Sequence, residues 1–208
     1  MMVADVIYSS QNSDWGTPQR LYDQLDRFFH FDIDVCADAW NAKHRCYISP
    51  EMDAFSTPWI SDGDSTAAWM NPPYGAGEKR CLLPHDRCKK KKCFKRGYHI
   101  DEDIPGVWDW VNRSINQVME NNITVVALLP SRTGERFFQH ALRFARCICF
   151  IKGRLRFERP NGGDSTTAPF PSAIMVFSRF LTGESVLPCL QPLGCSFDLD
   201  LLGGSFCE

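Results

Sequence analysis

Short apolar stretches alternate along the chain with stretches of helical periodicity, and no other feature restricts the fold as much. Residues 123–129 and 147–151 are apolar stretches of the kind that form buried strands of a parallel sheet. Between them, Phe137, Phe138 and Ala141 recur at the spacing of one helical face. Strands that alternate with helices predict an α/β sheet with helices on both faces.

The same pattern extends over most of the chain. A helix is expected to begin at Thr17–Pro18, with Thr17 as its N-cap. Residues 31–35 alternate apolar and acidic residues and predict a strand, and residues 68–70 predict another. Apolar residues recur at helical spacing in two further segments. The first contains Leu21, Leu25 and Phe28, and the second contains Val107, Val111, Ile115, Val118 and Met119. The second helix is expected to end near Asn121 and Asn122.

The end of the chain predicts a mixed sheet. Residues 154–158 and 173–178 are expected to be two final strands, joined by a Gly/Pro-rich loop, which would give the sheet an antiparallel edge. Residues 1–14 are polar and expected to be frayed, and residues 180–208 carry no clear pattern. With its 208 residues the chain is expected to form a single domain, residues 1–208.

Residues 76–106 interrupt this pattern. They show no periodicity and contain five Cys or His residues, so we expect them to form an insertion into the domain. Residues 79–96 hold nine Lys or Arg side chains and one acid, a local net charge of +8 in a chain whose overall net charge is −2. The overall value argues against a uniformly basic nucleic-acid binder, whereas charge this local predicts a patch that contacts an anionic partner.

Membrane and secreted classes are also disfavoured. The longest uninterrupted apolar runs, such as residues 125–129, are five residues long, far short of the roughly 18 that span a bilayer. Residues 1–15 lack a basic region followed by an apolar stretch, so we expect no secretory signal. Ten cysteines in such a chain favour metal ligands or buried thiols over a disulfide scaffold.

The sharpest local signal is the tetrapeptide Asn71-Pro72-Pro73-Tyr74. Its chance occurrence in a chain of this length has odds of about one in a thousand. It follows the predicted strand 68–70, and ligands of open α/β sheets bind at the carboxyl ends of strands. We therefore predict that Asn71, Pro72, Pro73 and Tyr74 form a catalytic loop rather than a rigid surface turn.

The residue types of this loop suit methylation of an amine. The exocyclic amine of adenine is a weak nucleophile, because its lone pair is conjugated into the ring. Two acceptors, the side-chain oxygen of Asn71 and the backbone carbonyl of Pro72, can take its two N–H bonds and favour a tetrahedral nitrogen. Prolines keep the turn rigid, and Tyr74 offers a flat face for a flipped base. S-adenosylmethionine would be the methyl donor, and catalysis would rest on positioning.

The insertion contains a candidate metal site. Cys81, Cys88, Cys93 and His99 are separated by six, four and five residues, and three thiolates with one imidazole suit tetrahedral zinc. His85 is a possible substitute ligand. Zinc would order a segment that has too few apolar residues to fold by itself, and the alternative is an unstructured basic loop with incidental cysteines.

Basic residues near these features predict contacts with DNA phosphates. Four consecutive lysines, Lys89, Lys90, Lys91 and Lys92, lie between two of the candidate ligands. Arg132, Arg154 and Arg156 follow the ends of predicted strands and are further candidates. The alternative for each of them is an ordinary solvated side chain.

The other cysteines are expected to be mostly buried thiols. They are Cys36, Cys46, Cys147, Cys149, Cys189, Cys195 and Cys207. The pair Pro188–Cys189 matches the nucleophile of cytosine C5-methyltransferases but lacks their partner motif, so we interpret it as a chance match.

Seven pieces of the chain, over residues 14–178, resemble the phage-type DNA N6-adenine methyltransferases. In order they are residues 14–18 (DWGTP), 31–37 (FDIDVCA), 41–43 (NAK), 53–55 (DAF), 69–75 (WMNPPYG), 128–133 (LLPSRT) and 153–157 (GRLRF). The resemblance implies a Rossmann-like S-adenosylmethionine-dependent methyltransferase sheet, with the cofactor half before the catalytic loop. It also implies a DNA substrate and a phage or prophage enzyme that acts in the cytoplasm of a bacterial host, where it protects phage DNA from restriction.

The resemblance implies a cofactor site as well. Trp15, Thr17 and Pro18 would contact the methionine end of the cofactor, and Asp34, Val35, Cys36 and Ala37 would form the loop after the first strand. Asp53 would accept a hydrogen bond from the cofactor's adenine, and Phe55 would pack on its plane. The chain departs from the usual methyltransferase pattern at Ala37-Asp38-Ala39, where a glycine-rich turn normally lets the backbone approach the cofactor.

Several alternatives remain at the level of the residues. The same loop could act on N4 of cytosine, on adenine in RNA or on a protein glutamine, although the last has no use for a +8 insertion. A non-catalytic, zinc-stabilised DNA-binding module is the alternative outside enzymes. The target sequence, the preference for duplex or single-stranded DNA and the oligomeric state are not encoded in any pattern that we recognise.

Overall fold

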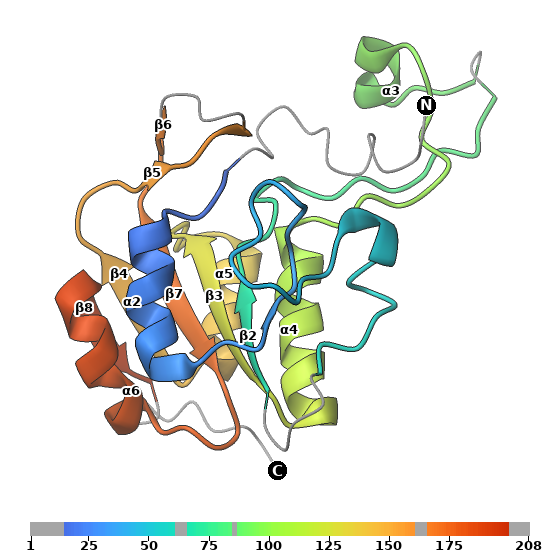
Figure 1. Cartoon of the computed structure of the whole chain (residues 1–208). Helices are drawn as coiled ribbons and strands as arrows, with labels where there is room; N and C mark the ends of the chain where they lie inside the picture. Colours follow the sequence, from blue (N-terminus) through green and yellow to red (C-terminus); the bar gives the residue numbers. More distant parts are fainter. Residues whose placement is uncertain (1–14, 61–65, 85–86, 161–165, 200–208) are drawn as a thin grey trace.

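The protein was analysed as a computed structural model, which describes residues 15–60, 66–84, 87–160 and 166–199 (Figure 1). The expected frayed segment 1–14 lies outside the described residues. The main sheet has six strands in the order β1-β2-β3-β7-β4-β8. They are β1 (Ile33–Asp34), β2 (Ala67–Met70), β3 (Thr124–Pro130), β7 (Ser172–Phe177), β4 (Cys147–Ile151) and β8 (Gly194–Asp198).

The first three strands of this order are parallel, and the rest of the sheet is mixed. β1 pairs with β2 and β2 with β3 in parallel, whereas β7 pairs antiparallel with both β3 and β4. β8 forms the antiparallel edge on β4. The predicted strand 173–178 therefore lies inside the sheet as β7 rather than at its edge, which only the long-range pairing with residues 124–130 could reveal.

Helices cover both faces of the sheet, as predicted (Figure 1). α2 (Gln19–Phe29) and α6 (Gly183–Leu190) pack on one face, and α4 (Val107–Asn121) and α5 (Arg136–Phe144) pack on the other. Each face of the sheet carries one hydrophobic core cluster, and β3 contributes residues to both. Val125 and Ala127 pack on the side of α4 and α5, whereas Val126 and Leu128 pack on the side of α2 and α6. This two-sided burial explains why β3 reads as a continuous apolar stretch.

Several local predictions need correction. Pro18, not Thr17, is the N-cap of α2, because the Pro18 carbonyl accepts from the backbone N–H of Leu21 and Tyr22 while Thr17 is buried. Phe28 is 39% exposed, and the neighbouring Phe29 enters the core instead. Met119 of α4 is 43% exposed.

The strand predictions at two ends of the chain were too long or misplaced. Only Ile33 and Asp34 of residues 31–35 form β1, and Asp34 is buried rather than solvated. From residues 154–158, only β5 (Arg156–Phe157) forms, and it pairs with β6 (Thr166–Thr167) in a separate two-stranded sheet. Residues 180–199, for which no pattern was visible, form α6, a short 3-10 helix (Gln191–Leu193) and β8.

Residues 76–106 leave the sheet shortly after the tetrapeptide Asn71–Tyr74 and return at the start of α4. Figure 1 shows the short helix α3 (Lys91–Arg96) well away from the sheet. The base of this projection is closed by paired backbone hydrogen bonds between Glu78 and Ile104. Gly77 and Gly106 approach so closely that a Cβ atom on either would collide with the backbone of the other.

No helix among the described residues is long and apolar enough to cross a lipid bilayer.

Candidate active site and metal cluster

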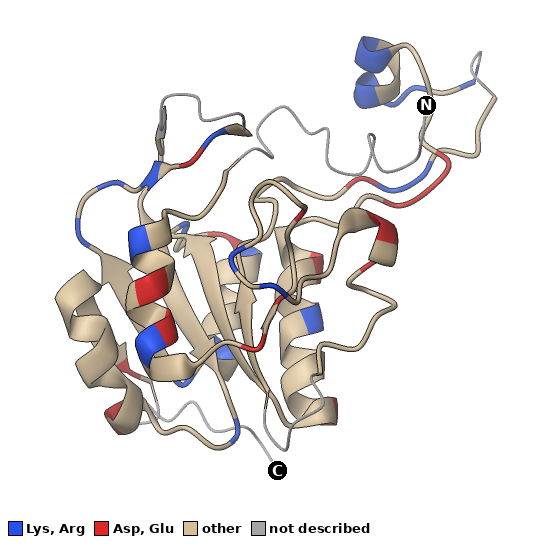
Figure 2. Cartoon of the chain, viewed as in Figure 1, with Lys and Arg blue, Asp and Glu red and all other residues tan. Residues whose placement is uncertain are grey.

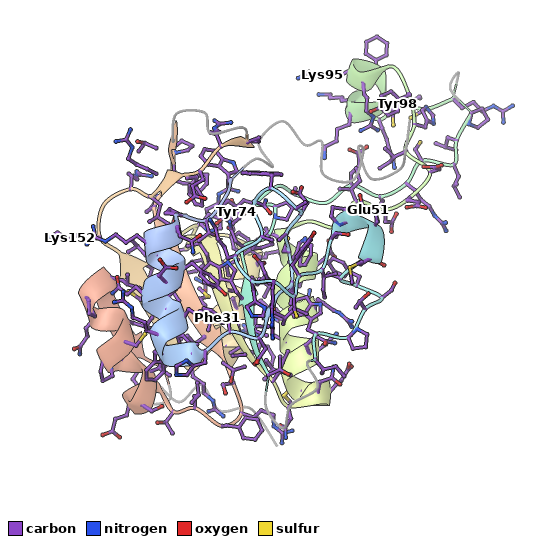
Figure 3. The ribbon with its side chains drawn as sticks, viewed as in Figure 1. Phe31, Glu51, Tyr74, Lys95, Tyr98 and Lys152 are labelled. Atoms are coloured by element: carbon purple, nitrogen blue, oxygen red, sulfur yellow. The ribbon has the colours of Figure 1, made fainter. Side chains whose placement is uncertain are left out.

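The tetrapeptide Asn71–Tyr74 lies at the carboxyl end of β2, in the middle of the parallel part of the sheet. β1 and β3 flank β2 in the same direction, so the loops after all three strands meet at one edge. Open α/β sheets bind their ligands at this edge. In Figure 3 Tyr74 lies at this end of the sheet.

The amide of Asn71 is held on both of its polar atoms. Its Nδ2 donates to the backbone carbonyl of Trp15 at 2.8 Å, and its Oδ1 accepts from the hydroxyl of Tyr74 at 2.6 Å. These contacts determine which end of the amide faces which partner. An amide oxygen has two lone pairs, so Oδ1 can accept a second hydrogen bond without releasing Tyr74.

Tyr74 is part of an aromatic wall. Its ring meets Phe170 at 5.4 Å and Phe157 at 6.3 Å between centroids, both edge to face. Trp15 packs against the same two rings. Tyr74 is only 7% exposed, so the face expected to receive a flipped base is covered in this state. Burial raises the pKa of the Tyr74 hydroxyl well above its usual range, which keeps it a hydrogen-bond donor.

The loop after β1 is organised by the carboxylate of Asp34. Its two oxygens accept from the backbone N–H groups of Cys36, at 3.4 Å, and Lys43, at 3.0 Å. Val35 donates its N–H to the carbonyl of Trp69 in β2. Asp34, Val35, Cys36 and Ala37 are all buried, so this predicted cofactor loop lies against the strand that carries Asn71.

The missing glycine turn has a structural explanation. None of the residues 35–42 has a positive φ angle, so the backbone there needs no glycine. The turn is closed instead by Asn41, whose side-chain oxygen accepts from the N–H of Asp38, while the Asp38 carbonyl accepts from Asn41 and Ala42.

An ion pair connects this loop to the start of the described chain. The buried Lys43 ammonium lies 2.6 Å from a carboxylate oxygen of Glu158. The other Glu158 oxygen accepts from the N–H of Gln19, and the backbones of Gly16 and Glu158 pair in both directions. These contacts fix the segment of residues 15–19, in which the backbone carbonyl of Trp15 accepts from Asn71.

Asp53 and Phe55 belong to a compact turn against α4. The carboxylate of Asp53 accepts from the N–H of Phe55 and from the hydroxyl of Ser56. The ring of Phe55 contacts Trp110 of α4 edge to face, at 4.8 Å between centroids. Asp53 is exposed and Phe55 half-buried, so both remain accessible to a ligand.

A pocket of about 510 Å³ adjoins the other side of the tetrapeptide. The pocket lies between the start of the insertion and the first turns of α4 and α5. Its lining residues are Tyr74, Ala76, Gly77, Val107, Trp108, Arg132, Glu135, Arg136 and Phe137. The guanidinium of Arg132 lies over the ring of Phe170, and that of Arg136 lies over Trp108. The pocket therefore combines aromatic surface with two cations.

The four predicted metal ligands come together in the insertion. The ligand atoms of Cys81, Cys88, Cys93 and His99 all lie within 4.8 Å of one another. The Sγ atoms of Cys81 and Cys88 are 3.4 Å apart, close to the roughly 3.8 Å between thiolates on one tetrahedral zinc. His85 lies outside the described residues.

The basic residues of the insertion fall into two groups. Lys90 donates to the carbonyls of Lys79 and Arg80, and Lys92 pairs with Glu78. All four lysines of the run, Lys89 to Lys92, are exposed, and Lys90 and Lys92 in addition brace the insertion internally. Figure 2 shows the basic residues of α3 at the same end of the molecule as those around β5, where Arg154 and Arg156 are exposed.

The sequence analysis missed the aromatic wall and the ion pair. Phe157 and Phe170 form that wall although they lie more than eighty residues from Tyr74 along the chain. The available signal was the proline-flanked phenylalanine in Pro169-Phe170-Pro171, directly before β7. In contrast, Pro188–Cys189 lies within α6, where burial raises the pKa of the Cys189 thiol to about 11, so it is not a ready nucleophile.

The burial of Asp34 leads to a pH prediction. Burial raises the pKa of this carboxyl to about 6 from an unfolded value of 3.8, against the opposing effect of two backbone N–H groups. Its contribution to stability is therefore complete below pH 3.8 and is lost as the pH rises through 6, by about 3 kcal/mol in total. Urea unfolding of wild type and Asp34→Asn between pH 4 and 7.5 measures this loss. Parallel pH profiles for the two proteins would contradict it.

Two comparisons with known proteins find relatives of this chain. A family model described as DNA N-6-adenine-methyltransferase (Dam) matches residues 6–190. A DNA N-6-adenine-methyltransferase of Haemophilus phage HP1 (strain HP1c1) is 26% identical over 169 residues, which cover 80% of this chain and 78% of the phage protein.

Proposed function

The chain belongs to the DNA N-6-adenine-methyltransferase (Dam) family, and from this premise we propose that Asn71–Tyr74 is the loop at which the N6 amine of adenine in DNA receives its methyl group. The observation that carries the proposal is the fixed amide of Asn71, oriented by Trp15 and Tyr74 at the carboxyl end of β2. A side chain held in this way pays little entropy when a substrate arrives.

The chemistry of the loop follows from its acceptors. Oδ1 of Asn71 retains one lone pair and accepts one N–H of the adenine amine, while the backbone carbonyl of Pro72 accepts the other. Both contacts withdraw the nitrogen lone pair from conjugation and direct it at the methyl group. Tyr74 holds Oδ1 in place through its hydroxyl and gives the base an aromatic neighbour when the wall opens.

The residues beside Asn71 fit S-adenosylmethionine. Buried Asp34, exposed Asp53 and the rings of Trp15 and Phe55 offer the carboxylates and aromatic faces that an ammonium group and an adenine require. We propose that the cofactor is held by Trp15, Thr17, Pro18, Asp34, Val35, Cys36, Ala37, Asp53 and Phe55. When bound, S-adenosylmethionine supplies an electrophilic methyl group on a sulfonium, so no metal is needed for the transfer itself.

The pocket beside Tyr74 suits the target nucleotide. Its volume of about 510 Å³ is within the usual range for small-ligand pockets. Trp108 gives it an aromatic surface, and Arg132 and Arg136 give it charges for phosphate. An extruded base would meet Tyr74 from this side.

We also propose that residues 76–106 are a zinc-ordered insertion in a single methyltransferase domain. Zinc bound by Cys81, Cys88, Cys93 and His99 would replace the apolar core that this segment lacks. The exposed lysines Lys89, Lys90, Lys91 and Lys92 would then face phosphates together with Arg132 and Arg154. DNA as the substrate and the phage relative favour a place of action in the bacterial cytoplasm and a role in protection from restriction.

The reaction is tested by transfer of a labelled methyl group to unmethylated DNA, followed by nuclease digestion and identification of the nucleoside. N6-methyladenine is the expected product. N4-methylcytosine would keep the mechanism and change the base, while the absence of both transfer and cofactor-induced thermal stabilisation would favour a DNA-binding module.

The ring and the hydroxyl of Tyr74 are expected to contribute unequally. Tyr74→Phe removes the hydrogen bond to Asn71 but keeps the aromatic wall, so turnover should fall by less than about ten-fold. Tyr74→Ala removes the wall and the neighbour of the base and should lower turnover by at least about 10²-fold. Single-turnover methyl transfer at saturating DNA compares the two. Equal losses would mean that the hydroxyl, not the ring, matters.

A further inference from the structure

The insertion presents an apolar side chain to solvent in the middle of a basic helix. Phe94 of α3 is 88% exposed, the largest exposed fraction among the large apolar side chains of the described residues. Leu82 and Leu83, at 76% and 52%, belong to the same projection. A phenylalanine in full contact with water costs solubility and contributes little to folding, so this placement calls for a partner.

The helix that carries Phe94 is fixed from its other side. Cys93 is buried in the predicted zinc cluster, and Arg96 donates to both carboxylate oxygens of Glu78. Cys93 and Arg96 are three residues apart and share the inner face of α3, which leaves Phe94 and Lys91 on an outer face. The metal ligand directly precedes Phe94 in the chain, so the metal cluster determines where this ring is presented.

The surroundings of Phe94 select the chemistry of its partner. Lys91 and Lys95 flank it and make no ion pair within the described part of the chain, whereas the nearby acid Glu78 is already paired with Arg96 and Lys92. Figure 3 shows Lys95 and Tyr98 on this projection, away from the sheet. An apolar ring flanked by two cations is complementary to a surface on which apolar planes are flanked by anions. DNA is such a surface, because its stacked bases lie between phosphates.

We propose that Phe94 is a wedge that inserts into the base stack of the DNA substrate while Lys91 and Lys95 contact the adjacent phosphates. The proposal rests on DNA being the substrate, as stated above. The start of the insertion lines the pocket beside Tyr74 through Gly77, and so does Val107, the residue that directly follows the end of the insertion. A base step opened by Phe94 would therefore be opened by an element attached to the proposed base pocket, which lowers the cost of extruding the target base.

The test measures DNA affinity and its salt dependence for a set of single variants. Phe94→Ala is expected to weaken binding of unmethylated duplex DNA, and to raise KM for DNA, by about ten-fold, because stacking on one base is worth roughly this much. Phe94→Trp keeps an aromatic plane and should bind as wild type does. Phe180→Ala, which truncates a ring that is 58% exposed on another segment, is the matched control and should change nothing.

Salt titration separates the ring from the charges. Phe94→Ala should leave the slope of log K against log salt concentration unchanged, whereas Lys91→Ala or Lys95→Ala should reduce it by about one. Unchanged affinity in Phe94→Ala, or a Phe94→Trp variant as weak as Phe94→Ala, would overturn the proposal. So would a change in sedimentation of Phe94→Ala without a change in DNA binding, which would assign the ring to a protein contact.

The same data separate this inference from the proposed function. If wild type binds DNA in a Phe94-dependent manner but transfers no methyl group, the wedge stands and the enzymatic proposal fails. If wild type methylates DNA and Phe94→Ala has unchanged KM and affinity, the wedge fails alone.

Discussion

Replacing Asn71 by alanine is expected to lower the turnover of methyl transfer by about 10³-fold and to leave S-adenosylmethionine affinity within a few-fold of wild type. The reason is that Oδ1 of Asn71 is, in the proposed function, the side-chain acceptor for the adenine amine, and a preorganised polar contact at a reacting centre is typically worth 10²–10³-fold. Turnover is measured at saturating DNA and cofactor, and cofactor affinity by calorimetry on the same preparation.

A second variant separates the chemical role of Asn71 from its structural one. Asn71→Asp keeps an acceptor for the amine but loses the donor to the Trp15 carbonyl, 2.8 Å away. Asn71→Ala loses this donor as well, so the two variants should have similar cofactor affinity, while Asn71→Asp should retain more turnover than Asn71→Ala because it keeps an acceptor. Equal loss of turnover and cofactor affinity in Asn71→Ala would mean that Asn71 has a structural role only.

Loss of zinc is expected to have the second large effect. Wild type should contain one zinc ion per chain, and Cys93→Ser should contain none, because Cys93 is a buried member of the four-ligand cluster. Without the metal α3 loses the anchor that Cys93 provides. DNA affinity should therefore fall by about 10²-fold, because the phosphate contacts and the Phe94 wedge are lost together. Metal analysis and DNA titration on one sample measure both quantities.

The control for this prediction is Cys195→Ser. Cys195 is exposed in β8, and it lies outside the four-residue cluster, so its replacement should alter neither the zinc content nor DNA binding. Purified wild-type protein without zinc would contradict the metal site. Zinc-free Cys93→Ser that binds DNA as tightly as wild type would instead show that the insertion contacts no DNA.

Predictions of the fold succeeded where the signal was local and strongly periodic. β3, α4 and α5 were visible because their apolar residues follow the strand or helix period over many residues. β1 was predicted too long, since only two of its residues pair with β2. The helix α6 was missed, because it contains Pro188 and carries a weak helical pattern.

Predictions of the site show the same division. The position of the tetrapeptide after a strand and the clustering of Cys81, Cys88, Cys93 and His99 could be predicted, because prolines next to a strand and closely spaced cysteines are local signals. The contact of Tyr74 with Phe157 and Phe170 could not be predicted, because those two rings belong to a segment distant in the sequence, residues 147–177. The bracing role of Lys90 could not be predicted either, since it depends on carbonyls that only the folded insertion brings near this side chain.

The sequence by itself determined the class of fold, and it predicted the tetrapeptide loop after β2 and the cluster of three cysteines and one histidine, because each depends on residue types within a short stretch of chain. Tertiary structure alone decided that Trp15 orients Asn71 from 56 residues away, that Lys43 reaches Glu158 and that β7 enters the sheet between β3 and β4. The physical reason is that such contacts depend on the path by which distant segments return to each other. That path is selected by the packing of the whole core rather than by any local preference.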